Sequence, residues 1–311
     1  MKLIFMGTPD FAAVILEKLV QSSHEVLLAV TREDKPKGRS RELSMPPVKE
    51  CAMKHGIPIF QPKQVRDAET IACLREKGAD IIVVAAYGRI LPKELLEMPR
   101  YGCVNVHASL LPKYRGASPI QRAILNGDKI TGVTVQQMNE GVDTGDILTK
   151  KEVPIRPDET GESLFDVLAE AGASLIVKTL DQIEAGTVTP KKQNDAEATN
   201  APLIRKEDGL LDFSKEAIVL EREIRGFYSW PGAYTVCHGK ILKVFKAEVF
   251  SEKPENAEPG TILSLKDGIA VACKEGVLLL KEVQLAGKRR MEASDYLRGC
   301  SMTVGERLGG D

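Results

Sequence analysis

Residues 79–86 read ADIIVVAA, an almost uninterrupted apolar run in which four side chains are β-branched. A strand of a parallel sheet has this composition when helices cover both faces of the sheet. Around it, shorter apolar runs alternate with amphipathic helical patterns over residues 1–193. Strands are expected at residues 2–6, 25–31, 102–107, 132–137 and 146–153, and helices at 119–125 and 162–184. The alternation predicts an α/β fold with a Rossmann-like, doubly wound, mostly parallel sheet.

The pattern changes after Gln193. Residues 194–205 are polar and poor in helical periodicity, which indicates a linker. Beyond a helical segment near residues 215–226, turn signals separate five short apolar runs, which are expected to form strands at residues 233–237, 241–249, 260–265, 269–272 and 277–283. Five short strands at this spacing favour a small OB-like barrel. We therefore predict an α/β domain over residues 1–193, a linker over 194–205 and an OB-like barrel over 206–311.

The composition of the chain excludes several classes of protein. Its 311 residues carry a net charge of −1, so nucleic-acid binding would need a local basic patch. The longest apolar runs are far too short to span a membrane. The six cysteines are scattered without a CxxC pair. We interpret them as reduced thiols of a cytoplasmic protein, and we expect no bound metal.

The turn after the first expected strand, Gly7-Thr8-Pro9-Asp10, lies where a dinucleotide-binding fingerprint would begin. It lacks the GxGxxG pattern, because proline replaces the glycine that allows close approach to a pyrophosphate. No Walker A motif occurs in the chain. Dinucleotide binding and phosphate-driven chemistry are therefore disfavoured, and a tight turn that starts a helix is the simpler interpretation.

Two polar residues interrupt the apolar run CVNVH at residues 103–107. Asn105 and His107 are two positions apart in an expected strand, so their side chains share one face near its carboxyl end. Open α/β sheets bind ligands at such ends. The other histidines adjoin serines or glycines and are expected in turns or at the surface: His24, His55 and His238. His107 is either a hydrogen-bonded structural histidine or a functional one.

The segment Asn139–Asp146 is a glycine-rich acidic loop. Such loops are usually solvated turns or occasionally calcium sites, but this one lacks the spacing of an EF-hand. A carboxylate here could face His107 across neighbouring strand ends, favour the protonated ring and orient it. An amide, an imidazole and a carboxylate suit acyl transfer to a nucleophile supplied by the substrate. The amide would donate to a developing oxyanion, and the imidazole would move protons.

Two motifs carry a resemblance to a known family. NVHASLLPKYRGASPIQ at residues 105–121 and GVDTGDIL at 141–148 resemble the 10-formyltetrahydrofolate-dependent formyltransferases. The first domain alone would match members that act on glycinamide ribonucleotide or on sugar amines. The whole chain is similar to the members that act on methionyl-tRNA, with matching motifs GTPDFA at 7–12, AAYGRILP at 85–92 and IRGFYSWPGA at 224–233.

The resemblance implies a donor, an acceptor and a set of site residues. The donor would be 10-formyltetrahydrofolate, and the acceptor would be the α-amino group of initiator methionyl-tRNA, formylated for translation initiation. It assigns catalysis to Asn105, His107 and Asp143. The expected folate-binding residues are Ser109, Leu110, Leu111, Pro112, Tyr87, Gly88, Arg89, Ile90 and Leu91. We expect a monomer with no metal and no membrane contact.

Residues 31–49 read TREDKPKGRSRELSMPPVK, a long polar segment between the second strand and the next helix. Residues 32–42 contain five basic and three acidic side chains. By itself this segment is either a solvated surface loop or an arm whose cations contact phosphates. The resemblance implies contact with tRNA and gives Arg39 the position of the key arginine. The expected tRNA-binding residues are Lys35, Lys37, Arg39 and Arg41.

Two other functions stay open at this point. One is a formyltransferase that acts on a sugar-nucleotide amine, against which the basic segment argues. The other is a non-catalytic RNA-binding protein with a folate-like pocket, against which the Asn105, His107 and Asp143 set argues.

Overall fold

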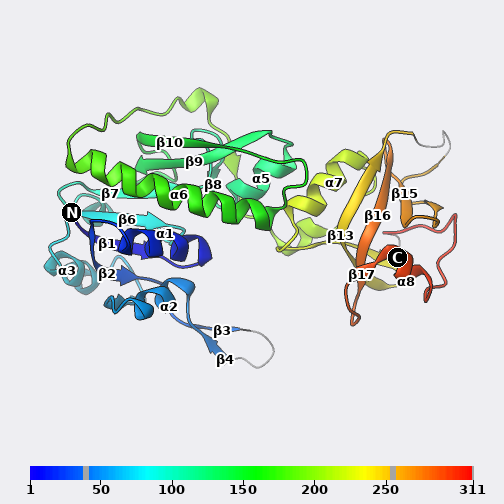
Figure 1. Ribbon diagram of the computed structural model, residues 1–311, viewed down its shortest axis with the longest axis horizontal. Coiled ribbons are helices and arrows are strands. Elements are labelled where there is room, and N and C mark those ends of the chain that lie inside the picture. The colour runs from blue at the N-terminus through cyan, green and yellow to red at the C-terminus, as the bar shows by residue number, and fades with distance from the viewer. Residues whose placement is uncertain (38–41, 253–256, 310–311) are drawn as a thin grey trace. The chain divides into compact units, whose positions relative to one another are not determined.

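The computed structural model describes residues 1–37, 42–252 and 257–309 (Figure 1). The chain divides into two compact units. The first unit comprises Met1–Pro119, Ile130–Pro154 and Phe165–Ala201. The second comprises Ile120–Lys129, Ile155–Leu164 and Pro202–Asp311. Two short segments of the N-terminal part thus fold with the C-terminal part.

A seven-stranded sheet forms the first unit, in the order β10-β9-β7-β6-β1-β2-β5. Its strands are β1 (Lys2–Gly7), β2 (Glu25–Val30), β5 (Ile59–Phe60), β6 (Ile81–Ala85), β7 (Cys103–His107), β9 (Ile130–Gln137) and β10 (Ile147–Pro154). The first five of these run parallel, whereas β9 and β10 pair antiparallel. The predicted Rossmann-like, mostly parallel sheet is confirmed.

Helices cover this sheet and explain the apolar composition of its central strands. All five residues of β6 are buried. Helix α1 (Asp10–Val20) and the long helix α6 (Gly161–Glu184) lie along one face (Figure 1). A Cβ atom on Gly172 of α6 would meet the Val106 side chain at 2.9 Å, so this helix packs directly on β7. The smaller helices are α2 (Pro47–Lys54), α3 (Ala68–Glu76) and α4 (Lys93–Leu96).

One histidine of this unit, His24, is buried although the sequence does not indicate it. His24 was expected in a turn or at the surface, but it is 5% exposed. Its Nε2 atom lies 3.2 Å from Asp181 Oδ1, and its Nδ1 atom lies 3.2 Å from the amino terminus. His24 does lie in the turn between α1 and β2, as expected, but its burial was not expected and arises because α6, distant in sequence, covers this turn.

The polar segment 31–49 contains a short hairpin. Strands β3 (Lys35–Lys37) and β4 (Glu42–Ser44) pair antiparallel, with Lys35 opposite Ser44 (Figure 1). Residues 38–41, which include Arg39 and Arg41, lie outside the described residues. Regular structure at the base of this segment was not predicted.

The second unit is built on a curled antiparallel sheet, in the order β12-β13-β16-β15-β14, with β17 paired to β16. The strands are β12 (Ala233–Cys237), β13 (Lys240–Phe250), β14 (Ile262–Ser264), β15 (Ile269–Ala272), β16 (Val277–Leu285) and β17 (Met291–Glu292). Its helices are α5 (Pro119–Leu125), α7 (Ala217–Gly226) and α8 (Ala293–Leu297). The pairing of β13 with β16 shifts register near Lys246, and such bulges increase strand twist.

Helix α7 buries Leu220 and Ile224 in a core shared with Leu242 and Leu280 of the sheet. The predicted OB-like architecture is confirmed, and all five expected strands are present with small changes of their ends. No helix among the described residues is long and apolar enough to cross a bilayer.

Candidate active site

The register of two strands creates the site. β7 pairs antiparallel with β9, so that Asn105 lies opposite Gln136 and His107 lies opposite Thr134. Residues two apart on a strand share a face, and directly paired residues of neighbouring strands share the same face. These four polar side chains therefore gather on one side of the sheet. The predicted common face of Asn105 and His107 is confirmed by their positions in β7.

Asp143 reaches this face by a route that differs from the expected one. Because β9 runs antiparallel to β7, the loop after β9 begins beside the amino end of β7, where Met138 N donates to Cys103 O at 2.8 Å. The loop then folds back over the strand face. A Cβ atom on Gly145 would lie 1.7 Å from Gln137 O, so only glycine permits this close return. The carboxylate thus approaches from above the strands, not from a neighbouring strand end.

Donors surround the carboxylate of Asp143. Its Oδ1 atom accepts from Gln136 Nε2 at 2.8 Å and from Asn105 Nδ2 at 3.4 Å. His107 Nδ1 lies 3.5 Å from the same oxygen. The Oδ2 atom accepts from the backbone N–H of Gly116 at 2.9 Å. Three side-chain nitrogens therefore point at one position that is occupied by a negatively charged oxygen.

The other ring nitrogen of His107 determines its tautomer. Nε2 lies 2.8 Å from the backbone carbonyl oxygen of Tyr114. A carbonyl can only accept, so Nε2 carries a hydrogen. A second proton, on Nδ1, would point at Asp143. The His107 side chain is 7% exposed and that of Asp143 is 14% exposed, so the pair is partly shielded from water.

Asp143 adopts an unusual backbone conformation, with φ of 52°. Aspartate and asparagine tolerate this left-handed region better than most residues. Gln193 holds the backbone of this loop in place, because its Nε2 atom donates to Asp143 O at 2.8 Å and to Gly145 O at 2.7 Å. Arg115 in turn donates from Nη2 to Gln193 Oε1 at 2.8 Å and to Asp195 Oδ1 at 2.7 Å.

Sequence reasoning missed both glutamines. The sequence gives a weak indication for Gln136, since this residue and Thr134 share one face of an expected strand. Its place in the site, however, depends on the pairing of β9 with β7. Gln193 has no local signal, since it lies just before the expected linker. The linker region returns to the first unit, where strand β11 (Asn200–Ala201) pairs parallel with β8 (Arg115–Gly116).

The expected folate-binding loop follows β7 directly. The Ser109 and Leu111 side chains are fully buried, whereas Leu110 and Pro112 are partly exposed. Thr134 Oγ1 donates to Ser109 O at 2.7 Å and accepts from Leu111 N at 3.1 Å. Lys150 Nζ donates to Leu111 O, and burial lowers the pKa of this lysine. The loop is thus tied to the face that carries Asn105 and His107.

The second expected folate-binding segment follows β6, the other neighbour of β7. Tyr87 and Leu91 are buried, whereas the Ile90 side chain is 58% exposed. Arg32, at the start of the basic segment, donates to Gly88 O. Arg89 donates to the backbone oxygen of Lys63. This segment offers one free apolar side chain, Ile90, at the end of the sheet where ligands bind.

Of the expected tRNA-binding residues, only Lys35 is described with its side chain, which is exposed. Lys37 is the last residue of strand β3, and only its backbone is described. Arg39 and Arg41 lie outside the described residues.

Comparisons with known proteins decide the family. Residues 1–180 match the family model described as formyl transferase, and residues 203–301 match that of the formyl transferase C-terminal domain. The chain belongs to the formyl transferase family. This formyl transferase is 52% identical over 306 residues to the methionyl-tRNA formyltransferase of Agathobacter rectalis, covering 98% of both chains. It is 49% identical to the protein of that name from Geobacter metallireducens, covering 99% of both chains.

Solved structures share the fold at lower identity. An N-formyltransferase from Helicobacter canadensis, in complex with folinic acid and dTDP-3-aminofucose, has a TM-score of 0.68 at 19% identity, covering 90% of this chain and 99% of that one. HypX from Aquifex aeolicus has a TM-score of 0.63 at 19% identity, covering 96% of this chain and 48% of that one. The chain therefore spans about half the length of HypX.

Proposed function

We propose that this formyl transferase moves a formyl group from 10-formyltetrahydrofolate to the α-amino group of initiator methionyl-tRNA. The observation that carries the assignment is the 52% identity, over 98% of both chains, to a methionyl-tRNA formyltransferase. The sugar-acting structural relative is only 19% identical, which supports the fold alone. We further propose that the chain acts as a monomer in the cytoplasm.

The donors around Asp143 support a direct-transfer mechanism. Asn105 Nδ2 and His107 Nδ1 point at the same carboxylate oxygen from 3.4 and 3.5 Å, distances too long for strong hydrogen bonds. Both N–H groups can therefore turn to a new oxyanion without losing a strong partner. Catalytic hydrogen bonds are often long in the free enzyme and shorten when the reacting groups arrive. Stabilising the oxyanion of the attacked formyl group is the first role that we assign to them.

His107 also has the position for proton transfer. Its Nε2–H is committed to Tyr114 O at 2.8 Å, so the mobile proton is the one on Nδ1. The neutral amine of the acceptor attacks the formyl carbon, and the bond from this carbon to N10 of the folate breaks. His107 would deliver its Nδ1 proton to N10, and the proton that the attacking amine loses would return to Nδ1, so that the ring ends in its starting state. Asp143 would hold the ring in the orientation and charge state that this step needs.

The donor pocket is proposed to combine the two segments that flank β7. The exposed Ile90 side chain fits a flat ring, because it provides an apolar surface beside backbone groups of residues 87–91. Since Ser109 and Leu111 are buried, the loop at 109–112 would contribute backbone groups together with Leu110 and Pro112. Solved relatives in complex with folinic acid or with tetrahydrofolic acid support a folate donor.

The acceptor is proposed to bind through the basic segment, with Lys35, Lys37, Arg39 and Arg41 on tRNA phosphates. The decisive experiment is transfer of a labelled formyl group from 10-formyltetrahydrofolate to methionyl-tRNA, with a dTDP-amino sugar as the competing acceptor. We expect labelled formylmethionyl-tRNA and no labelled sugar. Transfer to the sugar alone would replace the proposed acceptor, and no transfer to either would overturn the reaction.

A further inference from the structure

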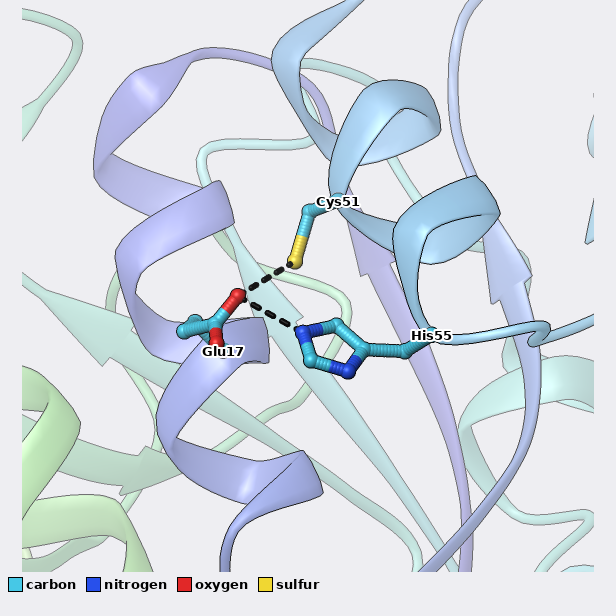
Figure 2. A group of neighbouring side chains, drawn as sticks. All are labelled: Glu17, Cys51 and His55. Atoms are coloured by element: carbon cyan, nitrogen blue, oxygen red, sulfur yellow. Dashed lines mark hydrogen bonds and ion pairs between the residues drawn. The ribbon is translucent and has the colours of Figure 1, made fainter.

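Three side chains of different chemistry meet between helices α1 and α2, in the first unit and outside the proposed active site. Glu17 comes from α1, Cys51 from the last turn of α2, and His55 from the residue that caps α2 (Figure 2). Residues four apart on a helix share a face, which explains why Cys51 and His55 point the same way. Among the residues that the structure describes, this is the one group of three or more potential metal ligands within 4.8 Å of one another.

One carboxylate oxygen joins the group. Glu17 Oε2 lies 2.8 Å from His55 Nε2 and 3.6 Å from Cys51 Sγ (Figure 2). A tetrahedral Zn²⁺ with ordinary bond lengths requires about 3.6 Å between its sulfur and oxygen ligands and about 3.4 Å between nitrogen and oxygen. The sulfur–oxygen distance already has this value. The nitrogen–oxygen distance must increase by about 0.6 Å, which a small movement at the end of the Glu17 side chain provides.

The surroundings of these three side chains suit a cation with one open coordination position. A cavity of ≈ 660 Å³ is lined by Glu17 and Cys51 and also by the acidic residues Asp10, Glu50 and Glu170. Two lysines, Lys18 and Lys54, also line this cavity. Lys54 is the one that contacts a proposed ligand, with its Nζ atom 3.3 Å from Glu17 Oε2. The Lys54 side chain is 67% exposed, so it can leave the carboxylate without breaking any packing.

We propose that Glu17, Cys51 and His55 bind one Zn²⁺ ion, with a water molecule from the cavity as the fourth ligand. Mixed sulfur, nitrogen and oxygen ligands suit this borderline-soft ion, whereas calcium and magnesium require oxygen ligands throughout. The thiolate and the carboxylate neutralise its two charges. The expectation of no metal rested on the absence of a CxxC pair, and this site draws its ligands from two helices.

Binding follows a balanced exchange of protons. Cys51 loses its thiol proton to solvent and bonds to zinc through the thiolate sulfur. His55 bonds through Nε2, so its single ring hydrogen moves to Nδ1.

The test is zinc titration of the purified full chain after treatment with a chelator, by calorimetry, with Co²⁺ as a spectroscopic substitute. We expect one equivalent of Zn²⁺ per chain, a higher unfolding temperature with zinc, and a thiolate-to-cobalt charge-transfer band with Co²⁺. Cys51→Ser should remove the band, and Cys51→Ser or His55→Gln should weaken zinc binding by at least about tenfold.

Two further variants make the test specific. Lys54→Ala should strengthen zinc binding, because it removes the cation that competes for Glu17. Cys73→Ser, which changes a cysteine outside the group, should leave affinity and spectrum unchanged. All variants are first checked for cooperative unfolding without metal, and Glu17→Gln replaces any that does not fold, since it keeps the shape and removes the anion. Absence of stoichiometric binding, or equal binding by wild type and Cys51→Ser, would overturn the site. Neither result bears on formyl transfer.

Discussion

His107 Nδ1 lies 3.5 Å from Asp143 Oδ1, and the ring is held in this position by the bond of 2.8 Å between its Nε2 atom and the Tyr114 carbonyl. One nitrogen therefore anchors the ring, and the other is available to a substrate. This division of contacts would let His107, in its proposed role, transfer a proton without losing its orientation. It also makes the contributions of the two residues separable by mutation.

Replacing His107 should remove both proton transfer and one oxyanion contact. We expect His107→Ala to lower kcat by about 10²–10⁴-fold while folate binding changes little. Steady-state kinetics and equilibrium folate binding measure the two quantities. His238→Ala is the matched control, because His238 is an exposed histidine in the second unit that contacts Glu306. A His107→Ala rate within about threefold of wild type would exclude this residue from the mechanism.

Asp143→Asn separates the charge of the carboxylate from its shape. Asparagine tolerates the left-handed backbone at this position, so the loop should keep its path. The ring of His107 loses the anion beside Nδ1, and we expect kcat to fall by on the order of 10²-fold. Steady-state kinetics measures this fall, and ¹⁵N NMR of the ring should show Nε2 still protonated, as its contact with the Tyr114 carbonyl requires. A kcat of Asp143→Asn equal to that of wild type would exclude the charge of Asp143 from the mechanism.

Gln193 is expected to act indirectly, by positioning Asp143, because it holds the backbone of the loop that carries Asp143. Gln193→Ala leaves two carbonyl oxygens without their donor, which costs about 1–3 kcal/mol if they stay buried. We expect kcat to fall by roughly tenfold, as is typical for residues that orient catalytic groups. Gln193→Glu keeps the contact with Arg115 but cannot donate, so it should show the same loss. A fully active Gln193→Glu enzyme would show that Gln193 does not position Asp143.

Arg39 and Arg41 test the acceptor. If both contact phosphates, Arg39→Ala/Arg41→Ala should weaken methionyl-tRNA binding and lower the slope of log K against log salt by about one unit per lost contact. Folate binding should not change. Lys77→Ala/Lys93→Ala removes the same charge from exposed positions elsewhere on the first unit and should leave the slope unchanged. If the two double mutants have the same slope of log K against log salt and the same formylation rate, the segment is a solvated insertion that does not contact tRNA.

The hydrogen bond from His55, together with Lys54, holds the pKa of Glu17 at about 2, well below the ordinary 4.5. A carboxyl with a depressed pKa in the folded state stabilises the fold above its unfolded value and loses this contribution as the pH falls towards 2. The group is partly exposed, so the contribution is about 1 kcal/mol. Urea unfolding with a chelator present should show the difference between wild type and Glu17→Gln shrinking by this amount from pH 6 to pH 3. A difference that does not vary with pH would contradict the ion pair.

Local patterns in the sequence were enough for the architecture. Within the apolar run at 79–86, residues 81–85 form a central strand in which every side chain is buried, and this requirement is visible in consecutive side chains. The same logic located Asn105 and His107 on one face, since a period of two is a property of the strand itself. The glycine-rich acidic loop also pointed to a carboxylate near them. Each of these inferences needs only neighbours in the chain.

Tertiary structure alone decided which distant groups meet. Gln136 joins the site because β9 pairs antiparallel with β7. Gln193 joins it because a hydrogen bond with Arg115, which is 78 positions away in the sequence, holds Gln193 against the loop that carries Asp143. His24 is buried by a helix more than a hundred positions away, and Glu17 meets Cys51 and His55 only because α1 and α2 pack together. Hydrogen bonds and ion pairs act over a few ångströms in space, whereas sequence periodicity reports only which side of its own element a residue occupies.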